Sequence, residues 1–137
     1  MGAKTSSLMA HINDFNDRGD YEGIIKFIEA LTPEEQTSDM VSQLARAYNN
    51  LAQAGETQPL EKALQLLDSI EPDERNNHYW HFRRAYSLYY LDRVTESLEH
   101  WEKALEYKPE DEDTKQFIQW SHEQLNALTF YHPFRER

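Results

Sequence analysis

The stretch "HWEKALEYKP" (residues 100–109) has the pattern of a helix that packs closely against a neighbour and ends abruptly. Trp101, Ala104 and Leu105 are spaced so that they share one face of a helix. A small residue on that face allows a second helix to approach, and the bulky residue fills the space beside the crossing. Pro109 has no backbone N–H and cannot continue a helix, so we expect the helix to end just before it. The stretch therefore predicts one member of a tightly packed helix pair.

Segments with the same helical spacing recur along the whole chain. Residues 78–91 and 94–107 form one pair, joined by a tight turn at Asp92 and Arg93. Glycine, proline and polar residues separate the remaining segments, which cover 5–18, 21–31, 38–54, 60–70 and 113–128. No segment alternates apolar and polar residues as a half-buried strand does. The sequence therefore predicts an all-α fold of seven helices, in antiparallel pairs with an odd helix at the end.

The composition narrows the possible classes of function. The chain has 137 residues, four glycines and no cysteine, which excludes a disulfide framework, a thiolate nucleophile and a zinc-thiolate site. A cytoplasmic location is the simplest expectation for such a chain. The formal net charge of −11 would repel a phosphate backbone, so nucleic acid is not an expected partner. No apolar run approaches the roughly 18 residues of a membrane span, so no contact with a membrane is expected.

The helix pairs also repeat, and each pair ends near a proline. They recur after about 34 residues and then after about 40, the difference lying in a longer loop before Pro59. If a repeat starts at His78, its eighth, eleventh, twentieth, twenty-fourth, twenty-seventh and thirty-second places hold Ala85, Leu88, Ser97, Trp101, Ala104 and Pro109. This pattern resembles the tetratricopeptide repeat, which has small residues at the eighth and twentieth places, bulky ones at the eleventh and twenty-fourth, then alanine and proline.

The resemblance implies a right-handed superhelix of about three helix pairs followed by a C-terminal capping helix. It implies one domain over residues 1–137, with repeats at 5–37, 38–77 and 78–111 and the capping helix and tail at 112–137. Within the tail, residues 130–137 are expected to fold back on the last helix or to act as a docking arm. Ile12 and Ile24 occupy places that are usually small, and the sequence leaves the register of the first two repeats open.

In this family the first helix of each repeat lines a concave groove that holds a peptide or a partner's helix. The groove places of the third repeat are rich in aromatic residues, and they hold Tyr79, Phe82, Arg83, Tyr86, Tyr89 and Tyr90. Aromatic and arginine side chains are frequent hot spots of binding, so these residues are the best candidates for a partner site. The alternative is that several of them, such as Tyr89 and Tyr90, pack on the adjacent helix or under the tail.

The groove places of the first two repeats are polar, and the candidates there are Asn13, Gln43, Arg46 and Asn49. Their amides could bond the backbone of an extended peptide, or they could form an ordinary solvated helix face. Some members of the family clamp a C-terminal carboxylate with two lysines, two asparagines and an arginine. Here Met9 and Tyr79 stand where the lysines belong, so a carboxylate clamp is not expected.

Three histidines and a carboxylate at helical spacings, His78, His81, His100 and Glu96, could bind zinc only if they converged. Histidines that pack in the core or face solvent explain this pattern better, so we expect no metal, no cofactor and no catalysis. If the chain were an enzyme, these histidines would suggest a metal-dependent hydrolase. The sequence predicts a non-catalytic interaction module with a protein or peptide partner and an unknown oligomeric state. The alternative function is an acidic chaperone or immunity-type protein that sequesters a basic partner protein.

Overall fold

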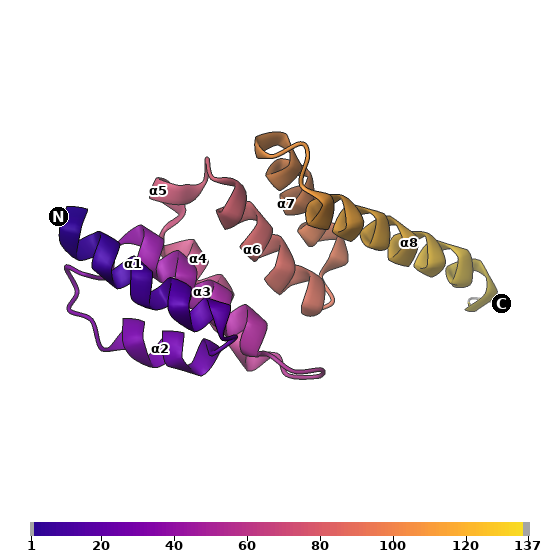
Figure 1. Ribbon diagram of the computed structural model, residues 1–137. Helices are drawn as coiled ribbons and strands as arrows, with labels where there is room; N and C mark the ends of the chain where they lie inside the picture. The colour runs from indigo at the N-terminus through magenta and orange to yellow at the C-terminus, as the bar shows by residue number, and fades with distance from the viewer. Residues whose placement is uncertain (1, 136–137) are drawn as a thin grey trace. The chain divides into compact units, whose positions relative to one another are not determined.

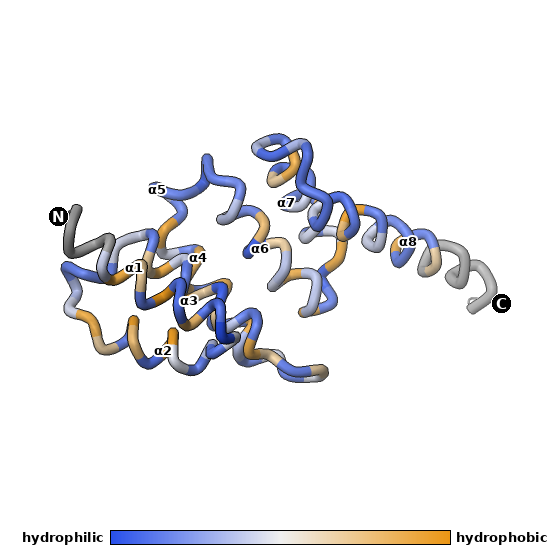
Figure 2. Tube along the Cα trace, in the orientation of Figure 1, coloured by the Kyte–Doolittle hydropathy of each residue, from blue (hydrophilic) through white to orange (hydrophobic). Residues whose placement is uncertain are grey.

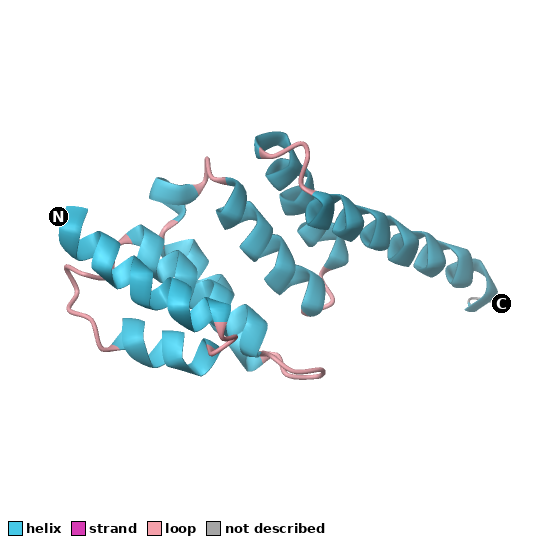
Figure 3. Cartoon of the chain, in the orientation of Figure 1, coloured by secondary structure: helices cyan, strands magenta, loops and turns pink. Residues whose placement is uncertain are grey.

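The computed structural model describes the backbone of residues 2–135 and the side chains of residues 7–127. Over this part of the chain every regular element is a helix, and the rest is loop or turn (Figure 3). The all-α class predicted from the sequence is confirmed. In the described residues no helix combines the length and the apolar character needed to cross a bilayer.

The helices, labelled in Figure 1, are α1 (Gly2–Asp17), α2 (Tyr21–Glu29), α3 (Ser38–Leu51), α4 (Gln58–Ser69), α5 (Glu71–Glu74), α6 (His78–Tyr90), α7 (Val94–Tyr107) and α8 (Glu112–Arg135). The prediction of seven helices is wrong by one, because α5 is an additional single turn. Its short sequence suits a helix start, with Pro72 in the first turn and acidic residues at the positive end of the helix dipole.

The last helix is longer than the sequence indicated. An aspartate starts it: Asp111 Oδ2 accepts hydrogen bonds from the amide and hydroxyl of Thr114. The backbone then remains helical as far as Arg135, so the predicted fold-back of the tail is wrong for residues 130–135. Neither glycine nor proline interrupts the chain between residues 112 and 132, which is the physical reason for the continuation. The side chains of the tail lie outside the described residues.

The chain folds as two compact units, Met1–Glu74 and Arg75–Arg137, called here the N-terminal and C-terminal units. Within them, the helices of each pair run antiparallel, α1 with α2, α3 with α4 and α6 with α7 (Figure 1). The organisation of residues 1–137 as a single domain, with the repeat boundaries given above, stays a prediction.

The core of the N-terminal unit forms where the apolar faces of α1, α2 and α3 meet. In α2 and α3 hydrophobic positions recur between hydrophilic ones, as expected for helices buried on one side (Figure 2). The fully or nearly fully buried members of this core are Ile12, Ile24, Ile28, Met40, Leu44 and Ala47. The tight turn between α1 and α2 uses Gly19, whose φ of +67° lies in the left-handed region that glycine adopts without steric cost.

A glycine in α2 allows α1 to pack directly on the α2 backbone. A Cβ atom added at Gly23 would lie 2.7 Å from two ring atoms of Phe15 and 2.6 Å from Oδ2 of Asp20. Asp20 also caps α2, because its Oδ1 accepts a 2.9 Å hydrogen bond from the Gly23 amide. Ile12 and Ile24, at the places that are usually small, are fully buried. The small residue of this pair is therefore Gly23, one position before the usual place.

Replacing Gly23 by alanine is expected to lower the free energy of unfolding by about 1 kcal/mol. Alanine gains roughly 1 kcal/mol of helix propensity over glycine, but overpacking against Phe15 and Asp20 costs roughly 1–3 kcal/mol. Urea unfolding followed by circular dichroism measures the difference, with Lys26→Ala at an exposed position of α2 as the control. A Gly23→Ala variant that is more stable than the wild type would contradict the close approach of α1 and α2.

The C-terminal unit has the packing predicted for the third repeat. The predicted core residues Ala85, Leu88, Ser97, Trp101 and Ala104 are all buried. Asp92 makes the turn between α6 and α7 with φ +68°, at the place that Gly19 takes between α1 and α2. Helix α8 packs against α7 with Phe117 stacked on Trp101, and its buried Ser121 satisfies its hydroxyl within the helix by donating to the carbonyl of Phe117 at 2.7 Å.

Candidate partner-binding surface

Four of the six candidates on α6 form a continuous row, called here the aromatic stripe: Tyr79, Arg83, Tyr86 and Tyr90. Their spacing of four, three and four residues places them on one face of the helix. The Arg83 guanidinium lies 5.3 Å from the centre of the Tyr79 ring, and the rings of Tyr86 and Tyr90 are 4.7 Å apart. Tyr79 is 47 % exposed and Tyr90 is 51 % exposed. The stripe therefore offers aromatic surface to solvent at both of its ends.

The other two candidates, Phe82 and Tyr89, turn toward α7 and α8. The Phe82 ring lies 4.9 Å from that of Trp101, and the Tyr89 ring lies 5.3 Å from that of Phe117. Phe117 is stacked on Trp101, with ring centres 4.3 Å apart and planes 10° from parallel. Burial is also the main cause that raises the pKa of the Tyr89 hydroxyl. Tyr89 thus packs on the adjacent helix, as expected if the tyrosines at the end of α6 are packing residues. The same alternative expected Tyr90 to pack in this way, but Tyr90 remains about half exposed.

The N-terminal end of the stripe is cationic. Two basic groups contact the Tyr79 ring: the Lys108 ammonium is 4.2 Å from its centre and the Arg83 guanidinium is 5.3 Å from it. Lys108 Nζ also donates a 2.5 Å hydrogen bond to the Tyr79 hydroxyl. These contacts hold the exposed Tyr79 ring in one orientation.

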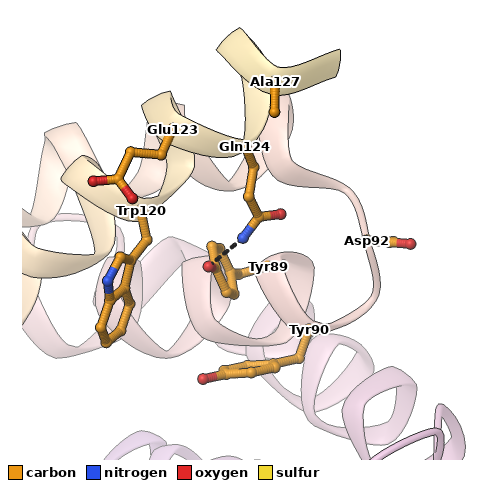
Figure 4. A pocket seen from close by; sticks show the side chains of 7 residues that line it. All are labelled: Tyr89, Tyr90, Asp92, Trp120, Glu123, Gln124 and Ala127. Atoms are coloured by element: carbon orange, nitrogen blue, oxygen red, sulfur yellow. Dashed lines mark hydrogen bonds between the residues drawn. The ribbon is translucent and has the colours of Figure 1, made fainter. Parts of the chain in front are cut away.

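An open pocket of 690 Å³ lies at the other end of the stripe, between the last turn of α6 and the middle of α8 (Figure 4). It is lined by Tyr89, Tyr90, Asp92, Trp120, Glu123, Gln124 and Ala127. The Tyr89 hydroxyl accepts a hydrogen bond from the Gln124 side-chain amide, drawn as a dashed line in Figure 4. The lining therefore joins α6 to α8 through a direct polar contact.

Sequence reasoning missed the α8 side of this pocket. It predicted a helix over residues 113–128 but named no site candidate in it, and so left out Trp120, which is 42 % exposed. The available signal was the large aromatic side chain itself, on a helix face that also carries Gln124 and Ala127 at helical spacing.

The polar candidates of the N-terminal unit do not form a free row of amides. Gln43 Oε1 accepts a 3.4 Å hydrogen bond from Asn16, and Arg46 donates to the side-chain oxygen of the same residue. Asn13 is exposed, whereas Asn49 is only 4 % exposed. Their role in binding stays a prediction.

The histidines do not converge on a metal. His78 Nδ1 lies 2.8 Å from the carbonyl oxygen of Ala104 and is used in joining α6 to α7. His81 and His100 contact each other, with 3.1 Å between their Nδ1 atoms. Among the residues that the structure describes, no group of three histidine, aspartate or glutamate side chains could hold a metal ion.

A chain of hydrogen bonds fixes the tautomers of His81 and His100. Arg84 Nε can only donate, so His100 Nε2 accepts its 3.2 Å hydrogen bond, and His100 Nδ1 carries the proton and donates to His81 Nδ1. His81 Nε2 then carries the proton of that ring and donates to the carbonyl oxygen of Arg75 at 2.6 Å. Each ring is therefore neutral in this arrangement.

We expect the stability of the C-terminal unit to fall when the pH drops below about 6.5, the ordinary pKa of histidine. Burial lowers the pKa of His81 in the folded protein, so the unfolded chain binds more protons in this range. The contribution of His81 is thus fully present above its unfolded pKa and is lost as the pH falls toward the folded pKa. Urea unfolding between about pH 7.5 and 5.5 measures the slope, because carboxyl groups ordinarily titrate below this window.

His81→Gln should flatten this slope, whereas His122→Gln, at an exposed position of α8, should leave it unchanged. Equal slopes in the wild type and the His81→Gln variant would show that the buried ring is not the source of the pH dependence.

Comparisons with known proteins agree with this geometry at the level of the fold. No family model matches the chain, and no curated protein sequence matches it. The first TPR domain of Spaghetti (RPAP3), solved with the HSP90 peptide SRMEEVD, superposes with a TM-score of 0.75 at 16 % identity, covering 90 % of this chain and 97 % of that one. The first TPR domain of human RPAP3, solved by NMR, gives 0.73 at 16 % identity, covering 90 % and 93 %. The chain therefore has the tetratricopeptide-repeat fold, which confirms the resemblance seen in the sequence.

Proposed function

We propose that this chain is a non-catalytic protein-interaction module that binds an extended peptide or partner segment along the aromatic stripe of α6, beside α8. The observation that carries the proposal is the pair of large aromatic side chains, Tyr79 and Tyr90, exposed at the two ends of one helix face. The peptide-bound structure of the RPAP3 neighbour supports peptide binding by this fold.

The stripe also has the energetic features of a binding surface. Tyrosine and arginine side chains provide much of the free energy of binding in protein interfaces. Here Arg83 and Lys108 hold the Tyr79 ring, and Tyr86 contacts the Tyr90 ring, so little side-chain entropy remains to be lost on binding.

The acidic peptide of the RPAP3 structure is not the ligand that we propose. Its sequence, SRMEEVD, contains three acidic residues. Met9 and Tyr79 occupy the places at which lysines form the carboxylate clamp, and the pocket at the far end of the stripe carries Asp92 and Glu123. A peptide rich in carboxylates would meet like charge there.

The other expectations of function have weaker support. No comparison favours the acidic chaperone or immunity-type protein, so we do not propose it. The absence of catalysis and the cytoplasmic location stay predictions. It also stays a prediction that neither nucleic acid nor a membrane is a partner.

Replacing Tyr79 and Tyr90 together by alanine is expected to weaken peptide binding by about tenfold or more, since a hot-spot side chain contributes more than about 1 kcal/mol. Random 12-residue peptides displayed on phage would be selected on the wild-type protein, and the enriched peptides would be measured by calorimetry on both proteins. Tyr107→Ala is the matched control, because Tyr107 is 40 % exposed but lies on α7, outside the stripe.

Unchanged affinity in the double variant, with its circular dichroism spectrum intact, would show that the peptides bind elsewhere. Failure to enrich any peptide would count against peptide binding as the function.

A further inference from the structure

The pocket at the C-terminal end of the aromatic stripe combines three aromatic rings with two carboxylates. Tyr89 and Tyr90 come from α6, Trp120 from α8, and the carboxylates belong to Asp92 and Glu123. None of the seven lining residues is basic.

The aromatic rings of the pocket are held in place by neighbouring rings. Trp120 meets Phe117 edge-on, with ring centres 5.3 Å apart and planes at 88°. Tyr90 meets Tyr89 in a similar way at 5.1 Å and 77°. Because each ring packs edge-on against another, the orientation of the pocket walls does not depend on a ligand. Trp120 and Tyr90 nevertheless remain about half exposed, so ring surface is accessible from solvent.

Of the two carboxylates, Glu123 lies closer to the rings. Figure 4 shows Glu123 beside Trp120 and Asp92 on the loop that follows α6, with its carboxylate pointing away from the rings. Glu123 Oε1 accepts a hydrogen bond from Gln119 Nε2 at 3.0 Å, within α8. That single contact leaves further acceptor positions on the carboxylate, since an ionised carboxylate has about four lone-pair sites.

We propose that this pocket binds an arginine side chain of the partner peptide. The face of an aromatic ring attracts a cation, and indole does so most strongly. A guanidinium group is flat and weakly hydrated, so it can stack on a ring while its N–H groups reach a carboxylate. The inference rests on the proposed function and adds to it the chemistry of one ligand residue.

The charge of the whole chain favours the same occupant. The formal net charge of −11 raises the local concentration of cationic segments and opposes acidic ones. The volume of 690 Å³ leaves room for a long side chain together with the backbone that carries it. The competing occupant is an uncharged side chain of similar shape, which would use the rings without the carboxylates.

The test separates these two occupants with small probes that do not require a known peptide. The ¹⁵N-labelled protein would be titrated with Nα-acetyl-L-arginine methylamide and, separately, with the citrulline analogue, which has nearly the same shape but no charge. The indole N–H resonance of Trp120, assigned from its loss in Trp120→Leu, reports on the pocket. We expect a saturable shift with the arginine compound and about fivefold or more weaker binding of the citrulline compound.

Charge-neutral variants locate the effect. Glu123→Gln should weaken binding of the arginine compound by about threefold, as expected for a solvent-exposed ion pair. Glu102→Gln makes the same change of charge at an exposed position of α7 and should leave the affinity unchanged. Equal binding of the two compounds, no shift at Trp120, or equal losses in both variants would overturn the proposal.

This experiment and the peptide selection can fail independently. If peptides bind through Tyr79 and Tyr90 but arginine does not bind at Trp120, the proposed function stands and this inference is wrong. If arginine binds at Trp120 but no peptide is enriched, the pocket is correctly assigned and the proposed function is wrong.

Discussion

Replacing Trp101 by alanine is expected to lower the free energy of unfolding by about 3–5 kcal/mol, the usual cost of truncating a buried aromatic side chain. Trp101 is fully buried. Its indole ring contacts Phe82 of α6 at 4.9 Å and stacks on Phe117 of α8 at 4.3 Å. Removing it would therefore leave a cavity where three helices meet.

Trp101→Phe provides the graded comparison. The indole Nε1 of Trp101 is buried without a hydrogen-bond partner among the described residues, so phenylalanine loses no hydrogen bond there and relieves an unsatisfied donor. We expect this variant to lose less than about 2 kcal/mol, the part caused by the smaller ring. Urea unfolding followed by far-ultraviolet circular dichroism measures both variants. Equal losses for Trp101→Ala and Trp101→Phe, or a loss under about 1 kcal/mol for alanine, would contradict the central position of this ring.

Ala104→Trp is expected to destabilise the protein by about 3 kcal/mol, at the upper end of the usual cost of overpacking. Ala104 is fully buried, and its carbonyl oxygen lies 2.8 Å from Nδ1 of His78. A side chain of α6 thus reaches the backbone of α7 at this point, and an indole ring would force the two helices apart.

The control for this substitution is Glu102→Trp, which places the same side chain at an exposed position of α7. Its thermal midpoint should remain close to that of the wild type. An unchanged midpoint in Ala104→Trp would show that the repeat register assigned to α6 and α7 is incorrect.

The residues whose burial was predicted correctly are part of helical spacing patterns within single segments of the sequence. Ala85, Ser97 and Ala104 are buried because small residues at helical spacing mark the contact face of a helix pair, and this spacing is visible in the sequence. The first pair was harder to interpret, since Gly23 replaces the small residue one position away. A shift of one residue moves a side chain by about 100° around a helix. The places of the repeat that are usually small therefore gave no signal here, because they hold Ile12 and Ile24.

The candidate site could be predicted only on its α6 side. Tyr89 and Tyr90 are adjacent in sequence and identical in type, yet one packs against Phe117 and bonds to Gln124 while the other is about half exposed. The difference comes from α8, whose Gln124 is 35 residues away from Tyr89 along the chain. No local pattern encodes which of two neighbouring tyrosines a distant helix will cover.

The sequence by itself determined the all-α class, the helix pairs and the core of the last pair, because the spacing of apolar and small residues decides which face of each helix must be buried. Only the tertiary structure decided which aromatic side chains remain accessible and that Trp120 and Glu123 complete a pocket with Tyr90 and Asp92. The physical reason is that a pocket forms from side chains on different helices, and their meeting depends on how α8 packs against α7.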